Sequence, residues 1–156
     1  MATKINGVQG LKDIVGKHLG YSSWHLITQG QINAFAEATG DHQWIHVDPE
    51  KAKTGPFGRT VAHGYLTLSL IPVLLPELLV VSGVTMGVNY GANKVRFPAP
   101  VPSGSNVRLG AVITSVTEIS GGVQSAIDVT IEVEGSSKPS LAAQVLFNYY
   151  LSPTPL

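Results

Sequence analysis

The stretch that decides the fold is AHGYLTLSLIPVLLP, residues 62–76. Its apolar side chains would fall on every side of a helix, which is typical of a helix buried on all faces. Between Thr60 and Asn93 the single formal charge is Glu77. We therefore expect a long apolar central helix here, which Pro72 would bend and Pro76 would end.

The chain beyond this stretch has the pattern of β-strands. Residues 123–134 alternate most clearly, with Ile127, Val129, Ile131 and Val133 on one face and polar side chains on the other, which predicts a half-buried antiparallel strand. We also predict strands at residues 84–90, 93–97, 107–116 and 141–149. Prolines at 98, 100 and 102 exclude a central strand between them. A three-strand meander behind a buried helix is an α+β arrangement, in which the sheet wraps the helix.

The chain before this stretch begins with a weakly patterned lead-in, residues 1–24. Thr28 followed by Gln31 has the spacing of a capping box, and Gly40 is a natural stop, which predicts a helix over residues 29–39. Asp48-Pro49 predicts a second, brief helix ending near residue 55.

Length and composition exclude several classes of protein. The 156 residues suit one domain, 1–156. Equal numbers of acidic and basic side chains predict no nucleic-acid partner and no membrane surface, and residues 65–79 are too short to span a bilayer. The absence of cysteine rules out a disulfide scaffold, a zinc ribbon and a cysteine nucleophile. With no apolar signal region in residues 1–11, we expect a cytoplasmic protein.

The densest polar cluster is GDHQWIHVD, residues 40–48, in an expected loop between helices. Asp41 and His46 could converge there as an acid/base pair, because both protonation states of an imidazole are reachable near neutral pH. Two alternatives stay open: a capping aspartate with a buried structural histidine, and a metal site of His42, His46 and Asp48. The metal alternative lacks the glutamate of H-E-x-x-H and leaves little room for a helix, so we expect no metal.

Ala62-His63-Gly64-Tyr65 is the second candidate, because it opens the apolar helix. The backbone N–H of Gly64 would be a free donor at a helix start, which is what an oxyanion hole requires. The alternative is an ordinary helix entry, with His63 as a capping or core residue. Motifs for a serine-hydrolase elbow, a P-loop or a dinucleotide fingerprint are absent from the sequence.

Together these features resemble the MaoC-like, (R)-specific enoyl-CoA hydratases. Gly40-Asp41, Ile45-His46 and Ala52 match that family's signature, as do Ala62-His63-Gly64 and the run VRFPAPV at residues 95–101. The resemblance covers residue 29 to the C-terminus. Much of the family has Asn-Pro where this chain has Gln43-Trp44, and the chain is most similar to a subgroup with Gly-Asp-His-Gln, an aromatic residue and Ile-His. This departure puts acyl-chain preference in doubt.

The resemblance implies a hotdog fold, in which a sheet wraps one long apolar helix, and a homodimer with its site at or near the subunit interface. It implies that water adds across a trans-2-enoyl-CoA to give (R)-3-hydroxyacyl-CoA, with Asp41, His46 and Gly64 as catalytic residues and without a metal or redox cofactor. A hotdog thioesterase and a non-catalytic acyl-binding module are the alternatives.

Further residues are candidates for holding the substrate. Lys94 and Arg96 could meet the phosphates of coenzyme A or merely solvate a strand edge, and Asn89 and Asn93 could bind the pantetheine amides. The remaining candidates surround the proposed acid/base pair: Gln43, Trp44, His63 and Tyr65.

Overall fold

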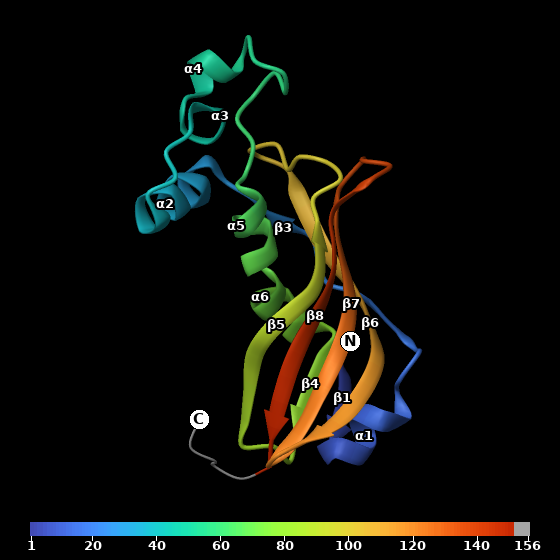
Figure 1. The fold of residues 1–156 in the computed structure, drawn as a ribbon. Helices are drawn as coiled ribbons and strands as arrows, with labels where there is room; N and C mark the ends of the chain where they lie inside the picture. Colours follow the sequence, from blue (N-terminus) through green and yellow to red (C-terminus); the bar gives the residue numbers. More distant parts are fainter. Residues whose placement is uncertain (152–156) are drawn as a thin grey trace.

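The predicted meander is the centre of a larger antiparallel sheet in the computed structural model, which describes residues 1–151. The last five residues of the predicted domain, 152–156, lie outside the described part. The strands are β5 (Met86–Arg96), β6 (Asn106–Ile119), β7 (Gly122–Val133) and β8 (Pro139–Tyr150), extended by β2 (His18–Tyr21) and β3 (His25–Leu26). Their order is β2-β6-β7-β8-β5, and β3 also pairs with β6 (Figure 1). The α+β class is therefore confirmed.

Strand β5 corrects the prediction of two separate strands at residues 84–90 and 93–97. It runs unbroken beside β8, and register shifts between Asn89 and Gly91 and between Ala92 and Lys94 keep the pairing going. Such bulges let one strand bend without ending. Because β5 pairs only with β8, it forms one edge of the sheet.

The expected single long helix is wrong. The apolar stretch forms three short pieces, α5 (Gly64–Ser69), α6 (Ile71–Leu74) and the 3₁₀ turn η1 (Leu75–Glu77). The break falls at Leu70, two residues before Pro72, because a proline lacks an N–H and its ring crowds the preceding turn. Burial on all faces is also wrong for this chain alone, since Tyr65 is 70% and Val73 62% exposed.

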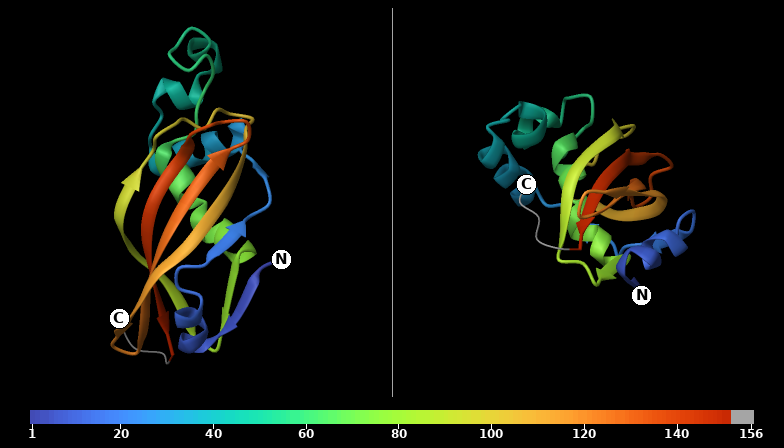
Figure 2. Two further views of the ribbon diagram at one scale, coloured as in Figure 1. Left: turned by 90° about the vertical axis from the view of Figure 1, so that its right-hand side faces the viewer. Right: turned by 60° about the horizontal axis from the view of Figure 1, so that its bottom comes forward.

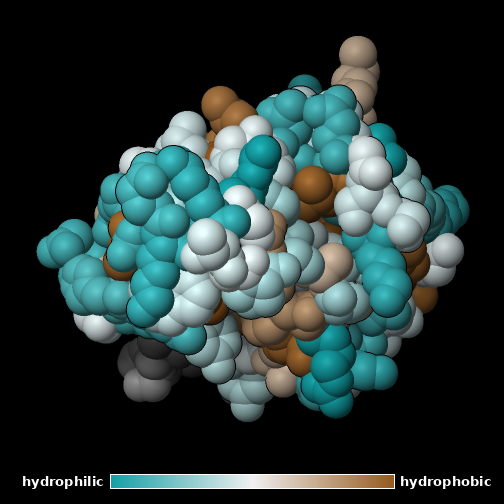
Figure 3. Space-filling view, turned by 90° about the horizontal axis from the view of Figure 1, so that it is seen from above, coloured by the Kyte–Doolittle hydropathy of each residue, from teal (hydrophilic) through white to brown (hydrophobic). Residues whose placement is uncertain are grey.

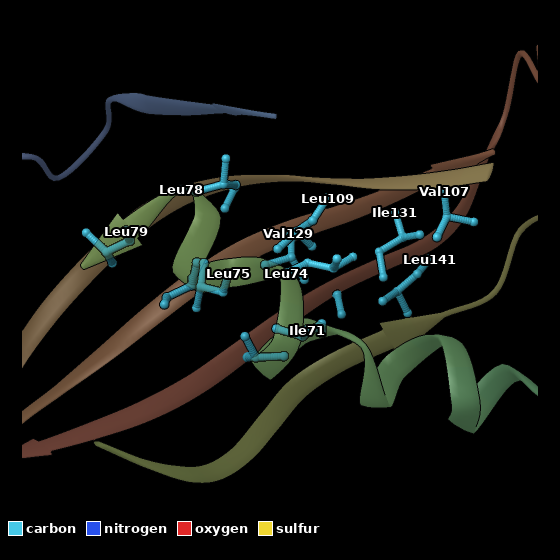
Figure 4. Close-up of a cluster of buried hydrophobic side chains, with 14 of the residues drawn as sticks. Ile71, Leu74, Leu75, Leu78, Leu79, Val107, Leu109, Val129, Ile131 and Leu141 are labelled. Atoms are coloured by element: carbon cyan, nitrogen blue, oxygen red, sulfur yellow. The ribbon is translucent and has the colours of Figure 1, made fainter. Parts of the chain in front are cut away.

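The core lies between these helical pieces and the inner face of the sheet (Figure 4). Ile71 and Leu74 belong to the same buried cluster as Leu109 and Ile131 of the sheet, and all four side chains are at most 2% exposed. Each such buried side chain contributes about 1.5–3 kcal/mol through the hydrophobic effect. This packing holds α6 against the sheet, and α5, which directly precedes α6 and contacts β8, places Gly64 beside it.

The lead-in is more structured than its weak pattern predicted. It forms β1 (Thr3–Asn6) and α1 (Gly7–Asp13), and β1 pairs in parallel with β4 (Leu79–Ser82), which directly follows the apolar stretch. The pair lies at the end of the sheet away from residues 29–52 (Figure 2). The lead-in therefore closes one end of the core.

Helices α2 (Gln29–Thr39), α3 (Trp44–Val47) and α4 (Pro49–Ala52) project beyond the opposite end (Figure 1). Helix α2 has the predicted bounds and the predicted capping box. The Thr28 hydroxyl accepts from the Gln31 N–H, and the Gln31 side-chain oxygen accepts from the Thr28 N–H. Asp48 caps α4 as expected. The expected loop at residues 40–48 is partly wrong, because one helical turn, α3, forms within it. None of the helices in residues 1–151 is long and apolar enough to cross a bilayer.

Candidate functional site

Asp41 stands where the chain reverses at the end of α2. Gly40 ends that helix with a φ of 82°, a left-handed conformation that glycine adopts without steric cost, and its N–H bonds the Ala36 carbonyl. The Asp41 carboxylate, about half exposed, then accepts from the Gln43 N–H at 3.3 Å. The turn therefore leaves the carboxylate accessible at the head of α3.

His46 lies on α3 and is 7% exposed. Its Nδ1 is 2.7 Å from the carbonyl oxygen of Val61. A carbonyl can only accept, so Nδ1 carries the hydrogen and Nε2 keeps its lone pair. The main chain at Val61 thus fixes both the orientation and the tautomer of His46, and leaves Nε2 able to accept a proton.

His63 precedes α5 and brings the two halves of the site together. Its Nε2 is 3.0 Å from the Asp41 carbonyl oxygen and 3.9 Å from that residue's carboxylate. Its ring stacks on His46 with centroids 3.8 Å apart and planes inclined by 24°. One side-chain N or O atom from each of Asp41, His46 and His63 lies within 4.8 Å of the others. The structure therefore places Asp41 beside His46.

The metal alternative of His42, His46 and Asp48 is not supported, because the structure uses two of these residues elsewhere. His42 lies 3.6 Å from Glu37, and Asp48 caps α4. Within residues 1–151 the group with ligand spacing is instead Asp41, His46 and His63.

A cavity of about 350 Å³ opens beside His46. Gly64 borders it at the start of α5, and within residues 1–151 the Gly64 N–H meets no acceptor. A Cβ at this position would come within 3.0 Å of the Phe97 ring, so glycine keeps the approach open. The remaining lining comes from Ile45, Phe57, Val61, Ala62, Thr67, Phe97, Pro98, Ala99, Pro100, Val101 and Ser140.

Three predicted substrate residues surround this cavity without lining it. Trp44 packs against Gly55 and under the Lys51 ammonium, which is 4.8 Å from its ring. Gln43 contributes a backbone N–H to Asp41. Tyr65 points outward and meets Phe97 edge-on, with centroids 6.2 Å apart.

The other predicted substrate residues lie in two separate hollows. Asn89 borders an apolar cavity of about 240 Å³ between α5, α6 and β5. Asn93, Lys94 and Arg96 border a groove of about 760 Å³ on β5, β7 and β8. Pro98 lines both this groove and the His46 cavity, so the two are neighbours.

Two residues that the sequence does not mark as functional brace α3. The side-chain amide of Gln29 donates to the His46 carbonyl at 2.7 Å, and its oxygen accepts from the buried hydroxyl of Thr60. No sequence signal marks them, because Gln29 reads as the first residue of a helix and Thr60 as part of a loop. They connect α2, α3 and the strand-like segment before α5.

Known proteins match both the sequence and the fold. A family described as MaoC like domain matches residues 11–135. The chain is 51% identical to 3-hydroxyacyl-thioester dehydratase Z of Mycobacterium tuberculosis over 143 residues, 91% of this chain and 95% of that protein.

Two solved structures share the fold at low identity. One is described as a monoamine oxidase regulatory protein from Archaeoglobus fulgius, with TM-score 0.77, 22% identity and coverage of 98% and 99% of the two chains. The other is an (R)-hydratase from A. caviae involved in PHA biosynthesis, with TM-score 0.69, 23% identity and coverage of 85% and 94%. The chain therefore belongs to the MaoC-like dehydratase family, and it is a hydro-lyase built on the hotdog fold.

Proposed function

We propose that the protein adds water to a trans-2-enoyl-CoA to give (R)-3-hydroxyacyl-CoA and catalyses the reverse dehydration. The observation that carries the proposal is Nε2 of His46, which has no hydrogen-bond partner within residues 1–151 and lies beside Asp41, on a residue that borders the same cavity as Gly64. The names of the M. tuberculosis and A. caviae relatives support a 3-hydroxyacyl thioester and the (R) configuration, respectively.

The chemistry follows from the roles of the three residues. His46 Nε2 accepts a proton from a water that Asp41 also orients, and the water oxygen bonds to C3 of the enoyl group. The electrons of the double bond move toward the thioester, and the Gly64 N–H donates to the resulting enolate oxygen. The acid/base pair then returns a proton to C2. The two steps add one hydrogen and one hydroxyl and need no metal or redox cofactor, and coenzyme A enters as part of the substrate.

Lys94 and Arg96 are proposed to meet the coenzyme A phosphates. They line the groove that adjoins the His46 cavity at Pro98. Within residues 1–151 neither side chain is in an ion pair, so their charges are available to an anion. A thioester at His46 would send its pantetheine arm over Pro98 toward these cations.

A homodimer through the β5 edge is also proposed. Tyr65, Val73 and Tyr90 are each more than 60% exposed on α5, α6 and β5, beside an unpaired strand edge. The end of the molecule that carries α2–α4 also shows apolar patches among polar ones (Figure 3). Exposed apolar area next to a free edge is typical of a surface that another chain covers. Light scattering of the wild type should give twice the mass of one chain. The substitution Tyr90→Lys should lower the measured mass toward that of a monomer. A monomeric wild type would contradict the proposal.

The reaction is tested with purified protein, crotonyl-CoA and a longer enoyl-CoA. We expect loss of the conjugated-enoyl absorbance without release of free thiol, and a product of (R) configuration by chiral analysis. Free thiol would indicate a thioesterase instead, and binding without turnover would indicate an acyl-binding module.

The residue roles are tested by Asp41→Asn and His46→Gln. Each should lower kcat by roughly 10²–10⁴-fold with the fold intact, because each removes one member of the acid/base pair. His42→Gln is the matched control, since His42 lies on the same loop but faces Glu37. Near-normal turnover by either site variant would overturn its assignment.

A further inference from the structure

His63 was expected to bind substrate, but its surroundings are those of an interior residue. The side chain is 3% exposed, and it is not among the residues that line the His46 cavity. In addition to stacking on His46, its ring contacts Phe35 of α2, with centroids 4.8 Å apart. A substrate in the cavity would meet His46 and not the ring behind it.

The hydrogen bonds of His63 use one nitrogen and leave the other without a partner. Nε2 faces the Asp41 carbonyl oxygen, and because a carbonyl only accepts, Nε2 carries the hydrogen. Nδ1 is fully buried and has no partner within residues 1–151. Buried polar atoms are normally paired, so an unpaired one requires an explanation. An apolar side chain here would avoid the unpaired nitrogen but would lose the Nε2 donor.

The bond to Asp41 acts on the backbone of the residue that supplies the carboxylate. Asp41 follows the left-handed glycine that ends α2, and its side chain is about half exposed. The Nε2–H of His63 is therefore an anchor that ties the Asp41 main chain to the start of α5, where Gly64 follows directly. One residue thus sets the distance between the carboxylate, His46 and the proposed oxyanion donor.

We propose that His63 is a positioning residue, which holds the Asp41 carboxylate in register with His46 by donating its Nε2–H to the Asp41 carbonyl. This inference rests on the proposed function. A displacement of about 1 Å in a reacting group can cost about 10²-fold in rate, so the effect should appear in kcat.

Three variants separate the donor from the ring. In His63→Gln the side-chain amide nitrogen can take the place of Nε2. In His63→Asn the shorter side chain brings its amide nitrogen only to the position of Nδ1. His63→Phe keeps an aromatic ring but has no donor. We expect His63→Gln to stay within about fivefold of wild-type kcat. The other two should lose about 10–100-fold in kcat while KM stays within about threefold. In an Asp41→Asn background, His63→Asn should cause almost no further loss, because the two act as a unit.

The outcomes distinguish this inference from the proposed function. A wild type that hydrates no enoyl-CoA refutes the proposed function, whereas an active wild type with a different ranking of variants refutes the role of His63. A raised KM at unchanged kcat would mean substrate binding, and a normal His63→Phe would mean that the donor is irrelevant. If the variants do not fold, imidazole ¹⁵N shifts of the wild type still decide: we expect the hydrogen on Nε2 of His63, and a hydrogen on Nδ1 would overturn the proposal.

Discussion

Gln29→Leu tests how the scaffold holds the His46 turn. The Gln29 amide donates to the His46 carbonyl at 2.7 Å, and its oxygen accepts from the Thr60 hydroxyl. Leucine has a similar volume and can form neither bond. The substitution therefore leaves one donor and one acceptor without their partners, at residues that are 3% and 7% exposed.

The cost follows from burial. An unpaired buried polar group costs about 1–3 kcal/mol, and two such groups at the edge of the interior give about 2–4 kcal/mol. The third contact of Gln29, to Asn33, is exposed and adds almost nothing. Thr60→Val alone should cost less, about 0.5–1.5 kcal/mol, because water can reach the half-buried amide of Gln29. The double variant has no orphaned hydroxyl, so it should recover about 1–2 kcal/mol relative to the sum of the single variants.

Urea unfolding monitored by tryptophan fluorescence, at one fixed protein concentration, measures these free energies. The slope of free energy against urea should be the same in all four proteins, so that midpoints can be compared. Asn33→Leu is the matched control, because it removes only the exposed contact. A loss under about 0.5 kcal/mol for Gln29→Leu, or strict additivity in the double variant, would refute the reasoning.

Three further predictions use the charges and the buried phenol. Lys94→Ala with Arg96→Ala should raise KM for an enoyl-CoA roughly 3–10-fold and leave KM for the matching pantetheine thioester unchanged; equal effects on both would contradict a phosphate contact. Hydrogen bonds from the backbone N–H and then from the hydroxyl of Ser23 lower the pKa of Glu77 below its usual 4.5. The ionised carboxylate therefore stabilises the folded protein fully above pH 4.5, and this contribution is lost as the pH falls through the lowered pKa of the folded state. In Glu77→Gln the free energy of unfolding should therefore fall less steeply as the pH is lowered below 4.5. An unchanged dependence of the free energy of unfolding on pH in this range would contradict the prediction. Burial raises the pKa of Tyr149 to about 12 from its usual 10.0, so stability should fall by about 2–3 kcal/mol as pH rises from 10 to 12, and Tyr149→Phe should remove this alkaline loss.

The elements that the sequence predicts best are those with local causes. Thr28 and Gln31 satisfy each other's backbone groups, and Gly40 ends the same helix, so α2 has the predicted bounds. Strand β7 alternates because one face packs on the core. Asp41 and His46 meet because a short turn follows a glycine, which the spacing alone made possible. The capping contacts of α2 lie within a few residues, and the alternation of β7 repeats every second residue, so both leave a local signal in the sequence.

The elements that the sequence could not predict depend on distant partners. The Val61 carbonyl that sets the His46 tautomer lies 15 residues away, and Gln29 lies 17 residues away. Backbone carbonyls and single polar side chains have no periodicity, so no pattern reports such a contact. The 70% exposure of Tyr65 has a similar cause, because an apolar pattern predicts burial but does not identify the surface that would bury the side chain.

The lead-in shows the same limit and explains the one charge in the apolar stretch. Glu77 accepts from both the backbone N–H and the hydroxyl of Ser23 and also contacts His25, so residues from before α2 satisfy a carboxylate at the end of η1. Upstream, β1 adds a parallel strand to β4, just beyond that carboxylate. A segment that packs across the end of a helical stretch meets it at isolated points, which leaves no repeating apolar period in its sequence. The weak pattern of residues 1–24 therefore reflects where they pack, and the isolated charge of Glu77 accepts two hydrogen bonds from the end of that segment, at Ser23.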